Sequence, residues 1–233
     1  MSDFVFSPPP LASLSVRGSR ARFPVRRIYC VGRNYSDHIR EMGGDPDREI
    51  PFFFQKPTDS IVENGSRIPY PLFTSDFQHE VELLIAIGKE GADIRLDEAL
   101  DHVFGVGVCI DLTRRDVQVE ARKTGRPWEI GKSFDESAPC SELVPVTSAE
   151  FPESGAIELR VNDQTRQHGD LRQMIWSSAE VIQQLSTQYR LMPGDLIMTG
   201  TPAGVGPLTP GDRVLATIEG IGSLEIEIVQ EER

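Results

Sequence analysis

Hydrophobic and polar residues alternate in several short segments of the chain, and this two-residue period predicts β-strands. The segments are separated by Pro, Gly, Asn and Asp residues, which favour turns. The sequence therefore predicts a domain in which strands predominate. The predicted strands cover residues 27–31, 79–88, 103–112, 156–162, 195–198, 213–219 and 223–229.

Helical patterns are fewer than strand patterns. One short helix is predicted at residues 36–42, and a second at residues 113–123 with Thr113 as its N-cap. A third begins at the capping box Ser177-Ser-Ala-Glu180. The strands and helices do not alternate regularly and no GxGxxG motif is present, so a Rossmann sheet is not expected. We expect an α+β fold, predominantly β.

The length of 233 residues fits one large globular domain. Residues 1–24 are rich in Pro, Ser and Arg without a sustained period, so we interpret them as an N-terminal arm. Residues 25–233 are then a single catalytic domain. Within it, residues 43–51 combine two glycines, charges and two prolines, which predicts an exposed, mobile loop.

Composition narrows the choice of partners and compartment. The formal net charge of -12 argues against nucleic acid, whose binding requires surplus Lys and Arg. No apolar run is long enough for a membrane span and no signal-peptide pattern is visible, so we expect a cytoplasmic protein without a membrane partner. Cys30, Cys109 and Cys140 form no CxxC pattern and are expected to be buried, reduced thiols.

Glu80 and Glu82 are two residues apart in an otherwise apolar segment, so on a strand both carboxylates project from one face. Two like charges beside Val81 and Leu83 repel each other and lose hydration unless a cation lies between them. A metal ion is the simplest such cation. The pair alone is more typical of a solvated face or of pairing with arginines than of a metal site.

Asp111 favours the metal, because it ends the apolar run of residues 106–110 directly before the predicted helix. Three carboxylates without cysteine or clustered histidine form a hard oxygen environment, which suits Mg²⁺ or Mn²⁺. Arg115 and Gln118 follow at offsets of four and seven and can lie on the helix face toward these acids. Lys132 lies in a loop beside a glycine. Each base alone is typical of a surface residue, but together they can supply the local cations that an anionic substrate needs.

Six motifs, in order over residues 26–229, carry a resemblance to a known family. They are Tyr35-Ser-Asp-His38-Ile-Arg-Glu41, Gln55-Lys56-Pro57, His79-Glu80-Val-Glu82-Leu, Asp111-Leu-Thr-Arg-Arg115-Asp-Val-Gln118, Gly131-Lys132-Ser-Phe-Asp135 and Met198-Thr-Gly-Thr201-Pro-Ala-Gly-Val-Gly206-Pro. On these motifs the sequence resembles the fumarylacetoacetate hydrolase family, and within it the compact acylpyruvate hydrolase branch.

The resemblance implies the mixed β-sandwich roll of the C-terminal domain of that family, usually in a homodimer. It also implies one Mg²⁺ or Mn²⁺ per subunit and a lid segment that acts on water. The residues it implies are the metal ligands Glu80, Glu82 and Asp111, the catalytic residues His38, Glu41, Lys132 and Gln118, and the substrate-binding residues Arg33, Lys56, Arg115 and Thr201.

The implied reaction is metal-dependent hydrolysis of a carbon-carbon bond in an acylpyruvate, with fumarylpyruvate to fumarate and pyruvate as the favoured case, in the breakdown of aromatic compounds. The partner is a small oxo acid. Two alternatives stay open: oxaloacetate decarboxylation or enol-keto isomerisation on the same fold, and non-catalytic binding of oxo acids. His38 and Glu41, three residues apart, can form a base and its orienter, which favours hydrolysis. His79, His102 and His168 are expected to be structural.

Overall fold

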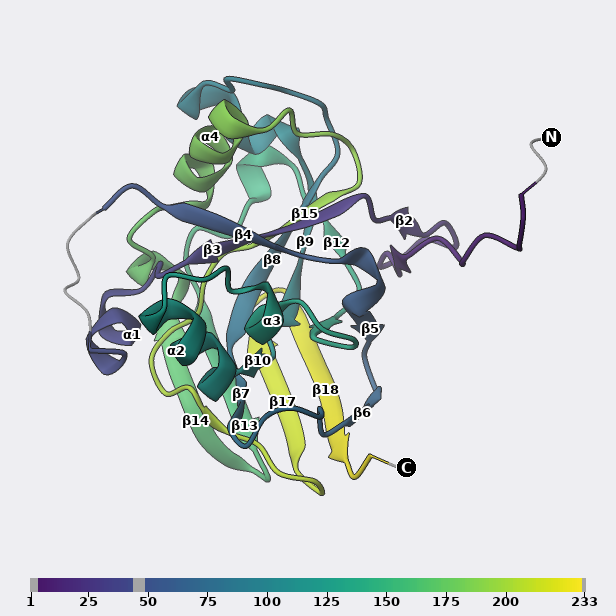
Figure 1. The fold of residues 1–233 in the computed structure, drawn as a ribbon. Coiled ribbons are helices and arrows are strands. Elements are labelled where there is room, and N and C mark those ends of the chain that lie inside the picture. The colour runs from purple at the N-terminus through teal and green to yellow at the C-terminus, as the bar shows by residue number, and fades with distance from the viewer. Residues whose placement is uncertain (1–3, 44–48, 232–233) are drawn as a thin grey trace.

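The computed structural model describes residues 4–43 and 49–231, and most of their regular structure is β-sheet (Figure 1). The largest sheet has the strand order β4-β3-β15-β8-β9-β11-β5, and β12 also pairs with β9. Its strands are β3 (Arg27–Gly32), β4 (Phe52–Lys56), β5 (Ile61–Glu63), β8 (Val81–Ile87), β9 (Val103–Ile110), β11 (Ala138–Cys140), β12 (Val144–Pro145) and β15 (Asp195–Met198).

A second sheet packs against the first and has the order β14-β13-β17-β18-β6. Its strands are β6 (Arg67–Pro69), β13 (Ala156–Val161), β14 (Gln164–Asp170), β17 (Arg213–Ile218) and β18 (Gly222–Val229). Two small sheets complete the strands of the described residues. One contains β7 (Phe77–His79), β10 (Thr113–Arg114) and β16 (Gly206–Pro207), and the other contains β1 (Ser13–Leu14) and β2 (Phe23–Pro24).

The helices are short and lie outside the sheets. In Figure 1, α2 and α3 lie in front of the large sheet with α1 beside α2, whereas α4 lies at the opposite end of the molecule. Their bounds are α1 (Ser36–Glu41), α2 (Arg115–Lys123), α3 (Glu129–Lys132) and α4 (Ser178–Gln188). Four 3₁₀ turns are found in the described residues: η1 (Thr58–Ser60), η2 (Leu96–His102), η3 (Ser148–Glu150) and η4 (Leu171–Gln173).

Strand β8 is buried along its whole length, because apolar groups cover both faces of the large sheet. Leu83 and Ile85 point into the core between the two large sheets. Leu84 and Ala86 point the other way, into a second core that the β1-β2 hairpin covers with Leu14. The even-numbered residues of β8 therefore share one face, and this face carries Glu82.

Most predicted elements are present, and each predicted strand overlaps an observed one. The capping box at Ser177 is confirmed, since its hydroxyl accepts the N–H of Glu180. The N-cap at Thr113 is wrong: Thr113 pairs with Gln78 in β10, and α2 begins at Arg115. The predicted loop of residues 43–51 lies partly outside the described residues.

None of the helices in the part of the chain that is described is long and apolar enough to cross a bilayer. All three cysteines are buried as free thiols. The division into an arm and one domain stays a prediction. Residues 13–24 form the β1-β2 hairpin, and residues 4–12 extend away from the body (Figure 1).

Candidate active site

Three buried carboxylates meet at the end of β8, and strand pairing brings them together. Glu82 lies opposite Cys109 of β9, and the Asp111 N–H donates to the Glu80 carbonyl at 2.8 Å, which places Asp111 opposite Glu80. Because alternate residues share a face, all three side chains project from the same side of the sheet. Ligand oxygens of the three lie within 4.8 Å of one another.

Cationic side chains form ion pairs with two of the three carboxylates. Lys132 Nζ lies 2.7 Å from Glu80 Oε2 and 2.7 Å from Asp111 Oδ2, and Arg115 forms a second ion pair with Glu80. Burial alone would raise the pKa of Glu80, but the charges of Lys132 and Arg115 outweigh it and lower that pKa. Burial would likewise lower the pKa of Lys132, but Asp111 and Glu80 raise it. Glu80 and Lys132 are therefore both charged at neutral pH.

Glu82 is the exception, because no cationic side chain among the described residues pairs with it. One oxygen accepts the Gly200 N–H at 2.7 Å. Burial, with the nearby charges of Asp111 and Glu80, raises the pKa of Glu82 well above its usual range. The protein thus holds a buried carboxylate that still lacks a cation.

One buried carboxylate oxygen of Asp111 likewise has no hydrogen-bond donor among the described residues. Its buried Oδ1 lies 2.9 Å from Lys56 Nζ, but the angle is that of an ion pair and not of a hydrogen bond. Three hard oxygen donors, one without a cation and one without a hydrogen bond, fit Mg²⁺ or Mn²⁺. Lys56, Arg115 and Lys132 carry three positive charges, as many as the three carboxylates carry negative ones. A divalent ion would therefore give the site surplus positive charge, which suits an anionic substrate.

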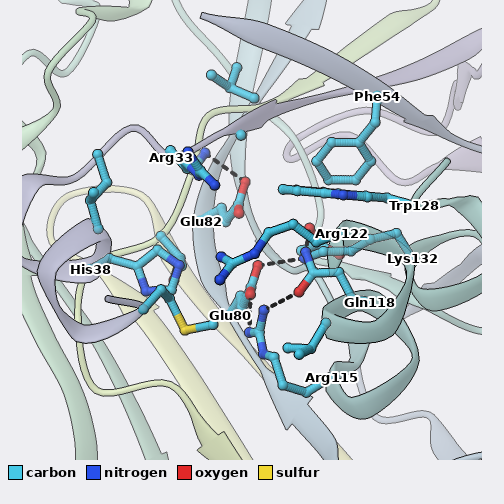
Figure 2. Close-up of a pocket in the computed structure, with 18 residues that line it drawn as sticks. Arg33, His38, Phe54, Glu80, Glu82, Arg115, Gln118, Arg122, Trp128 and Lys132 are labelled. Carbon is cyan, nitrogen blue, oxygen red and sulfur yellow. Dashed lines mark hydrogen bonds and ion pairs between the residues drawn. The ribbon is translucent and has the colours of Figure 1, made fainter. Parts of the chain in front are cut away.

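His38 enters the site from α1, opposite the sheet (Figure 2). Its Nδ1 lies 3.3 Å from Glu41 Oε2, and Glu41 also accepts the Gly204 N–H at 3.1 Å. Burial would raise the pKa of Glu41, but these two hydrogen bonds lower it, so the carboxylate is ionised at neutral pH. An ionised Glu41 that accepts the Nδ1 proton leaves Nε2 of His38 basic, which is the arrangement of a general base and its orienter.

A cleft that is open to solvent connects these groups. One part of its wall is apolar, and Phe54 and Trp128 lie there with ring centroids 6.0 Å apart. Arg33 and Arg122 also border it (Figure 2). The cleft therefore offers a charged floor, an aromatic side and two further cations.

Comparisons with known proteins agree with this geometry. The model of the family described as "Fumarylacetoacetate (FAA) hydrolase C-terminal" matches residues 27–229. The chain belongs to the fumarylacetoacetate hydrolase family. It is 42% identical over 189 residues to the fumarylpyruvate hydrolase of a Ralstonia species, which covers 80% of this chain and 98% of that protein. It is 40% identical to the mouse mitochondrial oxaloacetate tautomerase FAHD1, over 89% of this chain and 93% of that protein.

A solved member of the fumarylacetoacetate hydrolase family is also very similar in structure. The crystal structure of fumarylpyruvate hydrolase from Pseudomonas aeruginosa in complex with Mn²⁺ and pyruvate gives a TM-score of 0.96 at 48% identity, covering 98% of this chain and all of that one (100%). The predicted family and its predominantly β, α+β fold are therefore confirmed.

The structure brings most of the predicted site residues to the cleft. Those that border it are Arg33, His38, Glu80, Glu82, Asp111, Arg115, Gln118, Lys132 and Thr201. Glu41 lies behind His38. Lys56 lies beneath the floor, where its ammonium pairs with Asp111 and donates to the Leu112 carbonyl, so it reaches a substrate only through Asp111.

Thr201 borders the cleft, but its hydroxyl is engaged with the protein. It donates to the Val81 carbonyl at 2.8 Å and accepts from Gln167 Nε2 at 2.7 Å. The same Gln167 lies 2.9 Å from His79 Nδ1, which gives His79 the structural place expected for it. The hydroxyl therefore has no proton left for a substrate oxygen, and the role of Thr201 in substrate binding stays a prediction.

Sequence reasoning missed two kinds of residue at this fumarylacetoacetate hydrolase site. Arg122 follows Arg115 by seven positions, which places both on one face of α2, so helical spacing could have identified it. Asn34 carried no such signal. It is buried, donates to the Thr199 carbonyl at 2.8 Å, and fixes the loop whose Gly200 binds Glu82. Gly200 has φ of +97°, and a Cβ there would lie 2.6 Å from that of Asn34.

Proposed function

We propose that this protein is a metal-dependent acylpyruvate hydrolase that cleaves fumarylpyruvate to fumarate and pyruvate. The observation that carries the proposal is the His38–Glu41 pair facing three buried carboxylates across one cleft. The similarity to the Ralstonia and Pseudomonas aeruginosa fumarylpyruvate hydrolases supports it.

Glu80, Glu82 and Asp111 would hold one Mg²⁺ or Mn²⁺. Bound there, the ion would supply electrophilic stabilisation for the 2-oxo acid end of the substrate and for the negative charge that develops on it. The Mn²⁺ in the Pseudomonas aeruginosa enzyme structure supports this ligand set.

The chain's own residues provide the proton transfers. Nε2 of His38 takes a proton from the attacking water, while the ionised Glu41 stabilises the imidazolium that forms. The oxygen of that water adds to the distal carbonyl carbon, and the bond between this carbon and the methylene group then breaks. Water thus supplies the hydroxyl of fumarate, and the pyruvate fragment leaves as an enolate that takes up a proton.

Gln118 lies in the cleft wall and would donate to the oxyanion of the tetrahedral intermediate. Lys132, whose three N–H groups are engaged by Glu80, Asp111 and Thr113, would offset the negative charge of that oxyanion. Arg115 joins the floor to the wall, because it pairs with Glu80 and donates to the Gln118 side-chain oxygen. That bond leaves the amide N–H₂ of Gln118 available to a substrate oxygen. Arg33, Lys56, Arg115 and Thr201 remain the proposed substrate-binding residues.

Product analysis tests the proposal. The purified protein, supplied with Mg²⁺ or Mn²⁺, should convert fumarylpyruvate to equimolar fumarate and pyruvate, and chelation should stop turnover. Acetylpyruvate and oxaloacetate should be tested as substrates in the same assay. Failure to cleave any acylpyruvate while oxaloacetate is converted between its keto and enol forms would replace the proposal with the second candidate, which the 40% identity to mouse oxaloacetate tautomerase favours.

The setting of the reaction completes the proposal. We propose that the enzyme acts in the cytoplasm as a homodimer, in the breakdown of aromatic compounds. The family membership supports the assembly, and the exposed apolar residues Phe4, Val5, Phe6 and Leu11 of the arm are surface that a second subunit would cover.

A further inference from the structure

Arg122 is a cation at the cleft without a protein partner. It lies one turn beyond Gln118 on the face of α2 that borders the cleft, and its side chain extends into the cleft (Figure 2). Among the described residues it has no ion pair and no hydrogen bond. The five N–H groups of its guanidinium are therefore free for a ligand.

The other cations of this wall are already engaged. Arg115 is bound to Glu80 and Gln118, and Lys132 to Glu80 and Asp111. Arg33, on the same cleft, lies 6.0 Å from the Phe52 ring centroid and is largely exposed. Arg122 is also exposed to solvent, and its guanidinium adds a further positive charge beside these groups that can bind an anion. This anion belongs to the ligand, because no carboxylate of the described chain is within ion-pair distance.

The backbone of Arg122 is set back from the metal-binding end of the substrate. Seven helical residues rise about 10 Å along the axis, so the backbone of Arg122 is about that far from Arg115, which contacts Glu80. An extended chain of seven carbons, with bonds of about 1.5 Å, spans about 7–8 Å between its terminal carbons. The flexible side chain of Arg122 spans the remaining distance between its backbone and a carboxylate at the far end of such a chain. The aromatic part of the cleft wall, with Phe54 and Trp128, suits an uncharged carbon chain.

We propose that Arg122 is a specificity-determining residue that binds the distal carboxylate of dicarboxylic acylpyruvates. This inference rests on the proposed function for the orientation of the substrate, with its 2-oxo acid end at Glu80, Glu82 and Asp111. A guanidinium can bind a carboxylate through two parallel hydrogen bonds, which adds direction as well as charge. The enzyme then selects dicarboxylic acylpyruvates over acetylpyruvate.

Two non-cleavable ligands test the subsite by binding alone. 2-Oxoheptanedioate and 2-oxoheptanoate share the 2-oxo acid end and the chain length, and only the first has a distal carboxylate. Calorimetric titration of the Mn²⁺-loaded protein should show at least about tenfold tighter binding of the diacid. Arg122→Gln should remove that preference and change the affinity for the monoacid by less than about twofold. Arg122→Lys, which keeps the charge but not the paired donors, should retain part of it.

Lys123→Gln is the matched control, because it removes the same charge from the adjacent, exposed position, which does not border the cleft. It should leave the preference unchanged. Equal losses for both ligands in Arg122→Gln, no diacid preference in the wild type, or the same effect from Lys123→Gln would each overturn the subsite.

Kinetics separate this inference from the proposed function. In Arg122→Gln, kcat/KM for fumarylpyruvate should fall at least about tenfold relative to that for acetylpyruvate. An unchanged ratio in an active hydrolase overturns the subsite and leaves the proposed function standing. A protein that cleaves no acylpyruvate, yet prefers the diacid only when Arg122 is present, overturns the proposed function and keeps the subsite.

Discussion

Glu82 has the least compensated charge of the three clustered acids. It is buried, and the Gly200 N–H is its one hydrogen-bond donor among the described residues. Glu80 and Asp111, by contrast, are already paired with lysine and arginine side chains. A divalent ion would therefore stabilise Glu82 more than its neighbours, because it removes an unpaired buried charge.

Removing either Glu82 or Asp111 should abolish metal binding. Loss of a residue that only orients a ligand weakens metal affinity by about 10–100-fold, so loss of a direct ligand should exceed that range. Titration calorimetry with Mn²⁺ on Glu82→Ala and Asp111→Ala measures the change, and turnover should disappear with it. Glu120→Ala, an exposed acid on α2, is the control and should bind as the wild type does. Wild-type affinity in both site variants would contradict the assignment.

His38 allows water activation to be separated from metal binding. His38→Ala should keep the affinity for Mn²⁺ and oxalate near that of the wild type, because the imidazole's hydrogen-bond partner is Glu41 and not a clustered acid. Hydrolysis of fumarylpyruvate should fall by about 10² to 10⁴. Glu41→Gln should show a similar or smaller loss, since an amide can hold the ring but cannot stabilise the imidazolium.

Oxaloacetate provides the second readout of the same variants. Its decarboxylation requires stabilisation of an enolate but no attacking water, so any such side activity should survive both substitutions. Equal loss of the two activities in His38→Ala, with metal binding intact, would make His38 a substrate-positioning residue.

At the residue scale, the carboxylate cluster could be predicted because strand parity is visible in the sequence. Glu80 and Glu82 are two positions apart, and Asp111 ends the run that pairs with them. Asn34 could not be predicted, because its role depends on contact with Thr199, far away in the chain. The engagement of the Thr201 hydroxyl with Gln167 is hidden for the same reason.

At the element scale, the errors occur where tertiary contacts override local pattern. Thr113 has the character of an N-cap, but it pairs with Gln78, and its hydroxyl donates to the Asp111 carbonyl and accepts from Lys132. Strand β14 was not predicted, because most of its seven residues are polar and exposed. It forms through pairing with β13, whose alternation is clear. The position of β14 is thus set by its partner strand and not by its own pattern.

Asp170 should make the 3₁₀ turn η4 sensitive to acid. Its side chain accepts the Arg172 N–H, and hydrogen bonds from the Arg172 side chain and N–H lower the pKa of Asp170 to about 2, from 3.8. Because the folded pKa lies below the unfolded one, the contribution to stability is complete above about pH 4 and disappears as the pH falls through about 2.

Asp170→Ala should therefore lower the free energy of unfolding by about 1 kcal/mol at neutral pH, the usual loss for an N-cap. The difference from wild type should narrow at about pH 3, which urea unfolding at both pH values measures. Glu153→Ala, at an exposed position, is the control. A gap that stays constant between the two pH values would show that the carboxylate charge contributes nothing.

At the scale of the whole molecule, net charge and local charge have opposite signs. The chain carries a formal charge of -12, but Arg33, Arg115, Arg122 and Lys132 border one cleft. The composition predicted the negative net charge and the need for local cations. It did not predict which cations share the cleft. Their convergence depends on α2 and α3 packing in front of the large sheet (Figure 1).

The N-terminal arm gives the last prediction. Phe4, Val5, Phe6 and Leu11 are exposed to 68%, 100%, 77% and 71%, and residues 4–12 extend away from the body (Figure 1). Covering one such side chain is worth about 1.5–3 kcal/mol, so contact with a second subunit would strengthen a dimer considerably. Deletion of residues 1–11 should weaken dimerisation at least about tenfold, which corresponds to about 1.4 kcal/mol.

Sedimentation equilibrium over a range of protein concentrations measures this change. Phe4→Ser with Phe6→Ser should reproduce part of the effect without shortening the chain, because the two substitutions remove apolar surface and little else. Leu96→Ser, at a position that is 46% exposed on η2, removes a comparable apolar side chain from the body and should leave the equilibrium unchanged. A truncated protein that dimerises as the wild type does would show that the arm contributes nothing to assembly, and any dimer would then depend on the body of the domain.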